Sequence, residues 1–160
     1  MSSVYDLGPA GSPRPTAARP TELRGWIARI ESLRELQHVS GAHWDREIGA
    51  ISEINYRRKP SAALLFDDIV GYPRGYRVLT GSLSNARRMA VTLGLDPGLD
   101  TIGLVQALRG KPREWEAAAP RFEPEIVKAG PILENVIDGK DVDLTRFPAP
   151  VLSRSLNPTM

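Results

Sequence analysis

Residues 60–68 read Pro-Ser-Ala-Ala-Leu-Leu-Phe-Asp-Asp, and this stretch decides the fold class. The run at 62–66 is short and wholly apolar, and it is bounded by a proline and by two aspartates. Strands that are buried on both faces of a sheet have this composition, because neither face meets water. The sequence therefore predicts a buried strand at 62–66.

Helices and a shorter strand are predicted before this run. The first helix should begin at Thr21, a good N-cap, with Glu22 in its first turn, where the helix dipole favours a negative charge. Residues 35–39 alternate polar and apolar side chains, which indicates a short strand. A second helix should run from Asp45, as its N-cap, to about Tyr56.

The same alternation continues after the buried strand. A strand is predicted over 76–80, followed by a helix that Gly81 and Ser82 open and that runs to Leu93. A further helix fits 101–108 and is closed by the glycine, lysine and proline that follow it. Helices that alternate with strands are typical of a layered α/β domain.

The chain is expected to divide into four parts, of which the α/β domain occupies 21–118. Residues 1–20, rich in proline, glycine and alanine, should form a disordered tail. Prolines punctuate 119–150, where one strand is predicted at 132–137. This region should be a linker and the start of a second domain that is cut short, and 151–160 form the C-terminal end.

Composition excludes several classes of protein. The 160 residues suffice for one ordinary domain, and the net charge of +2 gives no general reason to expect nucleic acid or an anionic membrane as a partner. The absence of cysteine excludes a disulfide framework, cysteine-ligated zinc and a thiol nucleophile. The sequence has neither an apolar run of roughly 18 residues nor a secretory signal. A soluble, cytoplasmic protein without a membrane span is therefore expected.

Few residues stand out as candidates for chemistry. The two histidines, His38 and His43, have no obvious third ligand, so a structural or surface role is favoured over metal binding. Asp67 and Asp68 follow the buried strand, where α/β proteins gather their sites, and they could hold a cation or act in acid–base chemistry. A cap or turn role is the alternative, because neighbouring strand residues point to opposite sides.

Three further segments could bind an anion or line an interface. The loop from Tyr72 to Arg77 offers two tyrosines and two arginines for a carboxylate or phosphate, and its alternative is a structural loop. Ser82 and Ser84 lie near a predicted helix N-terminus, a potential anion site, although capping explains Ser82 as well. The basic stretch at 109–113 is expected to be a solvated helix end rather than a binding patch.

A series of short motifs resembles the UbiD family of (de)carboxylases. No single motif is specific, but together they occur in order over about residues 22–150. The motifs are LRGWI at 23–27, GAHWDREIGAI at 41–51, ALLFDDI at 63–69, GYP at 71–73, VLTGS at 78–82, ARR at 86–88, LG at 93–94, GKP at 110–112, PILEN at 131–135 and DLTRFPAP at 143–150.

The resemblance implies a fold and a chemistry. Family members are much longer, with an N-terminal α/β domain, a split-barrel domain that binds prenylated FMN, and a C-terminal oligomerisation element. They add or remove CO₂ on aromatic or α,β-unsaturated acids through a covalent adduct with the cofactor, and an Arg–Glu–acid network transfers protons. Mn²⁺ and K⁺ hold the cofactor phosphate. A flavin prenyltransferase as partner and a homo-oligomer are implied for the full-length enzyme.

The residues at 151–160 do not resemble the family. In the family, this stretch enters the cofactor domain, and the metal ligands and the Arg–Glu–acid network follow. No catalytic, cofactor-binding or metal-binding residue can therefore be assigned in this chain, which is expected to be inactive and to bind none of these cofactors alone. The implied role of its domain is to pack against the cofactor domain and help close the active site, with the loop from Tyr72 to Arg77 as a candidate rim.

Three hypotheses follow from the sequence. The chain could be the N-terminal portion of a UbiD-like (de)carboxylase, truncated or split from its catalytic part. It could instead be a stand-alone docking or regulatory subunit of a multi-chain carboxy-lyase, with a cofactor-bearing partner chain. A small anion-binding α/β module with its own ligand is the third hypothesis, which ligand-induced thermal stabilisation would support.

Overall fold

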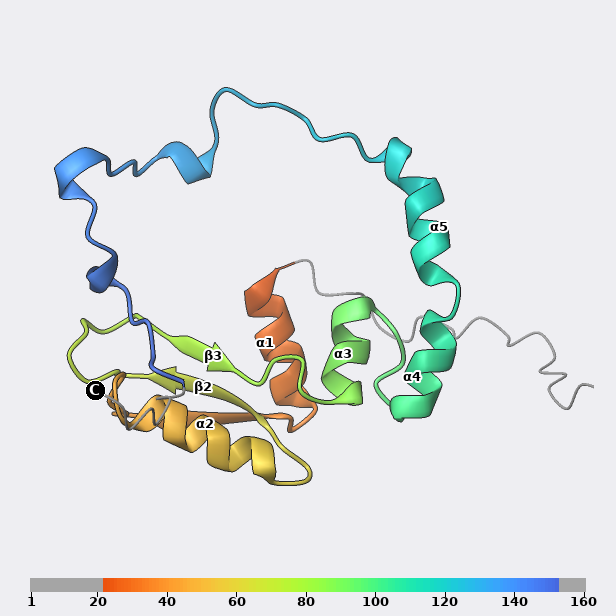
Figure 1. Ribbon diagram of the computed structural model, residues 1–160, viewed down its shortest axis with the longest axis horizontal. Coiled ribbons are helices and arrows are strands. Elements are labelled where there is room, and N and C mark those ends of the chain that lie inside the picture. Colours follow the sequence, from red (N-terminus) through yellow and green to blue (C-terminus); the bar gives the residue numbers. More distant parts are fainter. Residues whose placement is uncertain (1–21, 153–160) are drawn as a thin grey trace, which may run out of the picture.

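The structure is a computed structural model, and it describes residues 22–152. A three-stranded sheet of order β1-β2-β3 lies among the helices (Figure 1). The central strand β2 pairs in parallel with β1 and antiparallel with β3. The strands are β1 (Leu36–Ser40), β2 (Ala63–Asp67) and β3 (Val78–Thr80). The α-helices are α1 (Leu23–Ser32), α2 (Glu47–Arg57), α3 (Ala86–Leu93), α4 (Thr101–Leu108) and α5 (Lys111–Ala118).

Two apolar clusters lie on the two faces of the sheet. Leu64 of β2 packs with Ile48 of α2 in one cluster. Its neighbour Ala63 packs with Ile30 of α1 and Val91 of α3 in the other. Side chains alternate between the faces along a strand, so α2 covers one face and the pair α1 and α3 covers the other (Figure 1). The strand predicted from its wholly apolar sequence is indeed buried on both faces.

The predicted α/β class is confirmed, and so are several of its elements. The strands predicted at 35–39 and 62–66 lie within one residue of β1 and β2, and the helix predicted at 101–108 is α4. The predicted tail at 1–20, Thr21 and the terminal residues 153–160 lie outside the described residues. Helix α1 begins later than predicted, because its N-cap position is Glu22 and not Thr21, and Glu22 is therefore not in the first turn.

Helix α2 begins later than predicted. Asp45 is not its N-cap: the cap position is Arg46, and the first helical residue is Glu47. The backbone carbonyl of His43 accepts a hydrogen bond from the N–H of Glu47 at 3.0 Å, while the Glu47 carboxylate accepts one from the N–H of His43 at 2.8 Å. This reciprocal pair of hydrogen bonds takes the place of the predicted cap.

Helix α3 also begins later than predicted, and β3 is shorter than the strand predicted over 76–80. Gly81 has a φ of 71° and turns the chain after β3 instead of opening a helix. Asn85, and not Ser82, is the N-cap of α3, because its side-chain oxygen accepts a hydrogen bond from the N–H of Arg88 at 2.9 Å. Serine and asparagine are similarly good caps, so the sequence alone did not separate them.

After α4 the structure adds one helix that was not predicted and lacks one strand that was. The stretch at 110–112 ends α4 but also begins α5, since proline is tolerated in the first turn of a helix. The strand predicted at 132–137 is not formed: Pro131–Leu133 is a 3₁₀ helix, and the described residues from 119 to 152 contain no strand. An apolar run with no neighbouring strand to share its hydrogen bonds does not make a sheet.

Residues 119–146, called the arm below, differ from the body at 22–118. In Figure 1 the arm runs away from α5, arches, and returns toward the sheet and α2. Its regular structure is limited to short 3₁₀ helices with local hydrogen bonds, at Ala119–Arg121, Pro131–Leu133, Gly139–Asp141 and Leu144–Arg146. Residues 147–152, called the return segment, bring the chain back to α2.

Candidate functional site

The carboxyl ends of β1 and β2 carry a small polar cluster. Asp68, at a φ of 44°, accepts a hydrogen bond from the Ser40 hydroxyl at 3.3 Å and forms an ion pair with Arg74 at 3.3 Å. Asp67 is partly buried, and its Oδ1 atom has no hydrogen-bond partner. Among the described residues, no three or more His, Cys, Asp or Glu side chains gather into a possible metal site. These contacts are those of a turn at the end of a strand.

The two histidines make separate contacts. His38 lies on β1, and its Nε2 atom is 3.0 Å from the carboxylate of Glu31, with half of the histidine side chain exposed. His43 accepts a hydrogen bond from the N–H of Asp45 at 3.2 Å, and its ring stacks on that of Trp44. The two histidines therefore contact different residues, and these contacts are compatible with a surface or structural role.

The loop from Tyr72 to Arg77 is linked to the return segment through a chain of aromatic rings. Tyr72 meets Trp44 edge-on, with 6.4 Å between ring centroids, and it meets Tyr76 at 6.2 Å. Tyr76 in turn meets Phe147 edge-on at 6.0 Å. Edge-to-face pairs of this kind stabilise packing beyond the area they bury. Both arginines of the loop are exposed, so the tyrosines hold the packing while the guanidinium groups face solvent.

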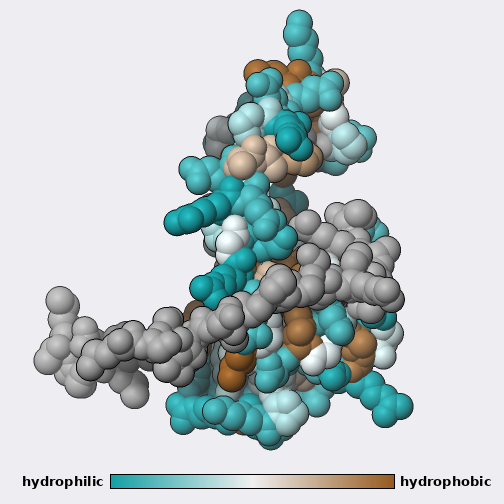
Figure 2. Space-filling view, turned by 90° about the vertical axis from the view of Figure 1, so that its right-hand side faces the viewer, coloured by the Kyte–Doolittle hydropathy of each residue, from teal (hydrophilic) through white to brown (hydrophobic). Residues whose placement is uncertain are grey.

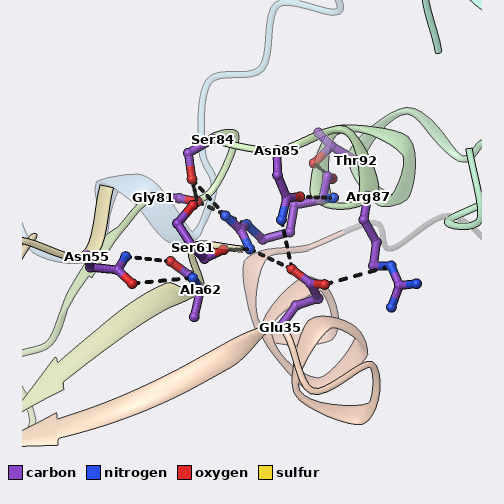
Figure 3. Close-up of polar contacts among 10 residues, drawn as sticks. Glu35, Asn55, Ser61, Ala62, Gly81, Ser84, Asn85, Arg87 and Thr92 are labelled. Carbon is purple, nitrogen blue, oxygen red and sulfur yellow. Dashed lines mark hydrogen bonds and ion pairs between the residues drawn. The ribbon is translucent and has the colours of Figure 1, made fainter. Parts of the chain in front are cut away.

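Arg88 is fully buried, and oxygen atoms of four residues surround its guanidinium group. Figure 3 labels these four residues, Glu35, Ser61, Gly81 and Ser84. Nη1 donates to the Glu35 carboxylate at 2.6 Å and to the Ser61 carbonyl at 2.9 Å. Nε donates to the Gly81 carbonyl at 3.0 Å, and Nη2 donates to the Ser84 hydroxyl at 2.7 Å. Burial lowers the pKa of Arg88, and the charge of Glu35 opposes this effect. The network ties α3 to the start of β1 and to two loops.

The network also changes the interpretation of the two serines. Both serines lie just before Asn85, the cap of α3, and so are near a helix N-terminus as predicted. Ser82 is not the cap, and Ser84 is engaged with Arg88 and Gly81. Neither Glu35 nor Arg88 was a candidate site residue from the sequence, where Arg88 stood only within the motif at 86–88. They are 53 residues apart, and no local pattern signals such a pair.

The basic stretch at 109–113 lies largely on the surface, as predicted. Arg109 and Arg113 are exposed, and Lys111 pairs with Glu114 at 2.6 Å within α5. In the described part of the chain, no helix has the length and apolar character needed to cross a membrane.

The arm exposes a row of apolar side chains. Hydrophobic groups stand out at the top of Figure 2, where Figure 1 places the arm. Ile126 is 94% exposed and Phe122 is 79% exposed. The other exposed apolar residues of the arm are Val127, Leu133, Val136, Ile137, Val142 and Leu144. Exposed apolar surface is typical of interaction sites, so these side chains make the arm a candidate docking surface beside the polar clusters of the body.

A shallow groove of roughly 770 Å³ lies between α2 and the return segment. Glu53 and Arg57 of α2 line it on one side, and Val151 and Leu152 line it on the other. Gly49 lies in the groove where the return segment crosses α2. An added Cβ atom at Gly49 would overlap the carbonyl oxygen of Val151, which shows how closely the two segments approach.

Comparisons with known proteins agree on one family. The family model UbiD_N, described as the N-terminal domain of 3-octaprenyl-4-hydroxybenzoate carboxy-lyase, matches residues 27–108. The pyrrole-2-carboxylic acid decarboxylase of Pseudomonas aeruginosa is 35% identical over 114 residues, which cover 66% of this chain and 22% of that protein.

Solved structures of the vanillic acid decarboxylase of Sedimentibacter hydroxybenzoicus, ShVdcCD, show a similar fold. The open form with a truncated ShVdcD matches with a TM-score of 0.67 and 27% identity, over 84% of this chain and 28% of that chain. The closed form matches with a TM-score of 0.69 and 27% identity, over 86% and 28%. Because 84% of this chain is more than residues 1–108 can supply, the match includes part of the chain after α4.

This chain spans less than a third of the relatives that it matches. The family model nevertheless covers half of it, and the fold agrees with the solved relatives. The chain therefore belongs to the UbiD family of carboxy-lyases and contains the N-terminal domain of that family.

Proposed function

We propose that this chain serves as the N-terminal portion of a UbiD-type non-oxidative (de)carboxylase that acts on aromatic or α,β-unsaturated carboxylic acids. The body is the α/β platform, and the arm is the surface that docks onto the cofactor-bearing part. Residues 119–150 would form the first part of that second domain. In this role the chain is inactive alone and helps to close the active site once it is docked.

The arm is the observation that carries this proposal. Its apolar side chains are exposed, and the chain corresponds to 22% of a curated decarboxylase and 28% of a solved one. Burying a side chain such as Ile126 or Phe122 stabilises an assembly by about 1.5–3 kcal/mol each. The remainder of a UbiD-type enzyme is the partner that we propose for this surface, because the match to a solved decarboxylase includes part of the chain after α4.

The described residues do not fit the metal-bound cofactor of the family. Prenylated FMN with Mn²⁺ and K⁺ requires a cluster of ligands, and residues 22–152 bring no three or more His, Cys, Asp or Glu side chains together for a metal. No step of the reaction is assigned to this chain. We propose that the cofactor and its metals bind to the part of the enzyme that follows this domain. A flavin prenyltransferase would supply the cofactor. The complete enzyme would be a homo-oligomer in the cytoplasm.

Two measurements test the proposal. The first reads the coding DNA past the codon for Met160 in all three frames, and we expect one frame to continue into a glycine-rich cofactor domain with an Arg–Glu–acid network. The second incubates the purified chain with prenylated FMN, Mn²⁺, K⁺ and a panel of aromatic and unsaturated acids, and we expect no release of CO₂. Decarboxylation by the chain alone contradicts the proposal.

A stand-alone docking subunit is the second candidate function. The vanillic acid decarboxylase ShVdcCD favours it, because one structure of that enzyme is described with a truncated ShVdcD as a separate component. In this case no downstream frame encodes a cofactor domain. A tagged copy of the chain, purified from its own source, should then recover a second polypeptide that carries flavin.

A further inference from the structure

We propose that the return segment, residues 147–152, is a latch that seats on α2 at Gly49 and holds the arm ready for docking. The proposal rests on the proposed function for the docking of the arm, and it adds how the arm is held before anything binds to it. The contacts that carry it all lie within this chain.

Gly49 provides the seat of the latch. It is buried within α2, and an added Cβ atom would overlap the carbonyl oxygen of Val151 and lie 3.0 Å from the Cα atom of Leu152. Only a residue without a side chain leaves room for this crossing. Glycine inside a helix costs about 0.5–1 kcal/mol relative to alanine, and the close approach of the return segment is the reason for it here.

Two further contacts hold the return segment in place. The N–H of Val151 donates a hydrogen bond to the carbonyl of Trp44 at 3.3 Å, just before α2 begins. The ring of Phe147 meets that of Tyr76 edge-on, with an angle of 89° between the ring planes. Tyr76 contacts Tyr72, which contacts Trp44. Both contacts therefore lead to Trp44, one through its backbone and the other through its ring.

The latch fixes the second end of the arm against the body. One end of the arm continues from α5, and the other is held at α2 (Figure 1). A segment that is tethered at both ends has less conformational freedom than one tethered at a single end, so less entropy is lost when it docks. The latch thus presents the apolar side chains of the arm in an ordered path before assembly.

Hydrogen exchange at the Val151 amide, followed by NMR on the full chain, tests the latch. Gly49→Val places a branched side chain where the return segment crosses, so we expect exchange at Val151 to become at least about tenfold faster than in the wild type. The amide of Leu65, in the centre of β2, should keep its protection. Gly103→Ala in α4 also enlarges a helical glycine, and it should leave Val151 unchanged.

Phe147→Ala is the second variant, and it tests the latch without disturbing the core. The Phe147 side chain is 57% exposed, so its loss should leave the body folded while exchange at Val151 becomes faster. Unchanged exchange at Val151 in Phe147→Ala overturns the proposal even if Gly49→Val fails to fold. An unprotected Val151 amide in the wild type overturns it as well. These readouts need no partner or cofactor, so they are independent of the tests of the proposed function.

Discussion

The body and the arm contain similar apolar residues but bury them differently. Phe66, Ile30 and Ile48 of the body are 0% exposed, whereas Ile126 of the arm is 94% exposed. Burial in a core is what offsets the entropy lost when a chain becomes ordered. The body therefore has a buried core of its own, whereas the described chain leaves the apolar side chains of the arm exposed.

Removing the partner of Arg88 should produce the largest loss of stability in the body. Glu35→Ala leaves a fully buried guanidinium without its counter-charge, so we expect the free energy of unfolding to fall by about 3–5 kcal/mol. Urea denaturation followed by tryptophan fluorescence measures this change.

Glu53→Ala is the matched control for that variant. It removes an exposed ion pair with Arg57 on α2, and such pairs contribute about 0.5 kcal/mol or less. Similar losses for Glu35→Ala and Glu53→Ala would show that the buried network does not hold the body together.

Replacing the cap of α3 should have a smaller effect on the body. Asn85→Ala removes the acceptor for the N–H of Arg88, and losses of this kind amount to about 1 kcal/mol. Ser82→Ala should change the free energy of unfolding by about 0.5 kcal/mol or less, because Ser82 does not cap the helix. Thermal denaturation measures both variants. If Ser82→Ala lowered the melting temperature more than Asn85→Ala, Ser82 and not Asn85 would be the cap of α3.

Replacing apolar side chains by serine should have almost no effect on stability in the arm, in contrast to the core of the body. Phe122→Ser combined with Ile126→Ser should change the free energy of unfolding by about 0.5 kcal/mol or less, because both side chains are already in water. Ile30→Ser in the core should instead cost several kcal/mol. If the double variant loses as much free energy of unfolding as Ile30→Ser, the arm contributes to the core, and the contrast between an exposed arm and a buried body is wrong.

Acidification should loosen one turn of the arm while the body stays folded. Hydrogen bonds from the side chain and the backbone of Thr145 lower the pKa of Asp143. A carboxylate whose pKa is lower in the folded state stabilises the turn above its unfolded pKa, and this contribution is lost as the pH falls through the folded value. The Thr145 amide shift in an NMR pH titration should therefore follow Asp143. A shift that appears only when β2 loses protection would contradict this.

Local signals were sufficient to predict much of the body. The apolar run at 62–66 and the alternation at 35–39 report directly on how each strand meets the core. The predicted starts of the helices were less accurate than the strands. Asp45 and Ser82 are both good cap residues, yet the caps of α2 and α3 are Arg46 and Asn85. Tertiary contacts decide where each helix begins. Residues 132–137 pair apolar side chains with Glu134 and Asn135, which is a weaker strand signal than the wholly apolar run at 62–66, and the described chain offers them no partner strand.

The candidate site depends on contacts that a local pattern does not contain. Glu35 and Arg88 meet across 53 residues, and Gly49 gains its role only when Val151 returns to cross it. The motif around Gly49 is part of the family resemblance, which gives no physical reason for a glycine at this position. Long-range packing supplies that reason.

The exposed arm also bears on how long an undocked copy of the chain survives in the cell. Proteases cleave extended, solvent-exposed segments first, and Lys128 and Lys140 lie in exposed positions of the arm. Docking would hide the same segment. Copies that find their partner would then outlast copies that do not, and degradation itself would keep the amount of this chain matched to the amount of its partner.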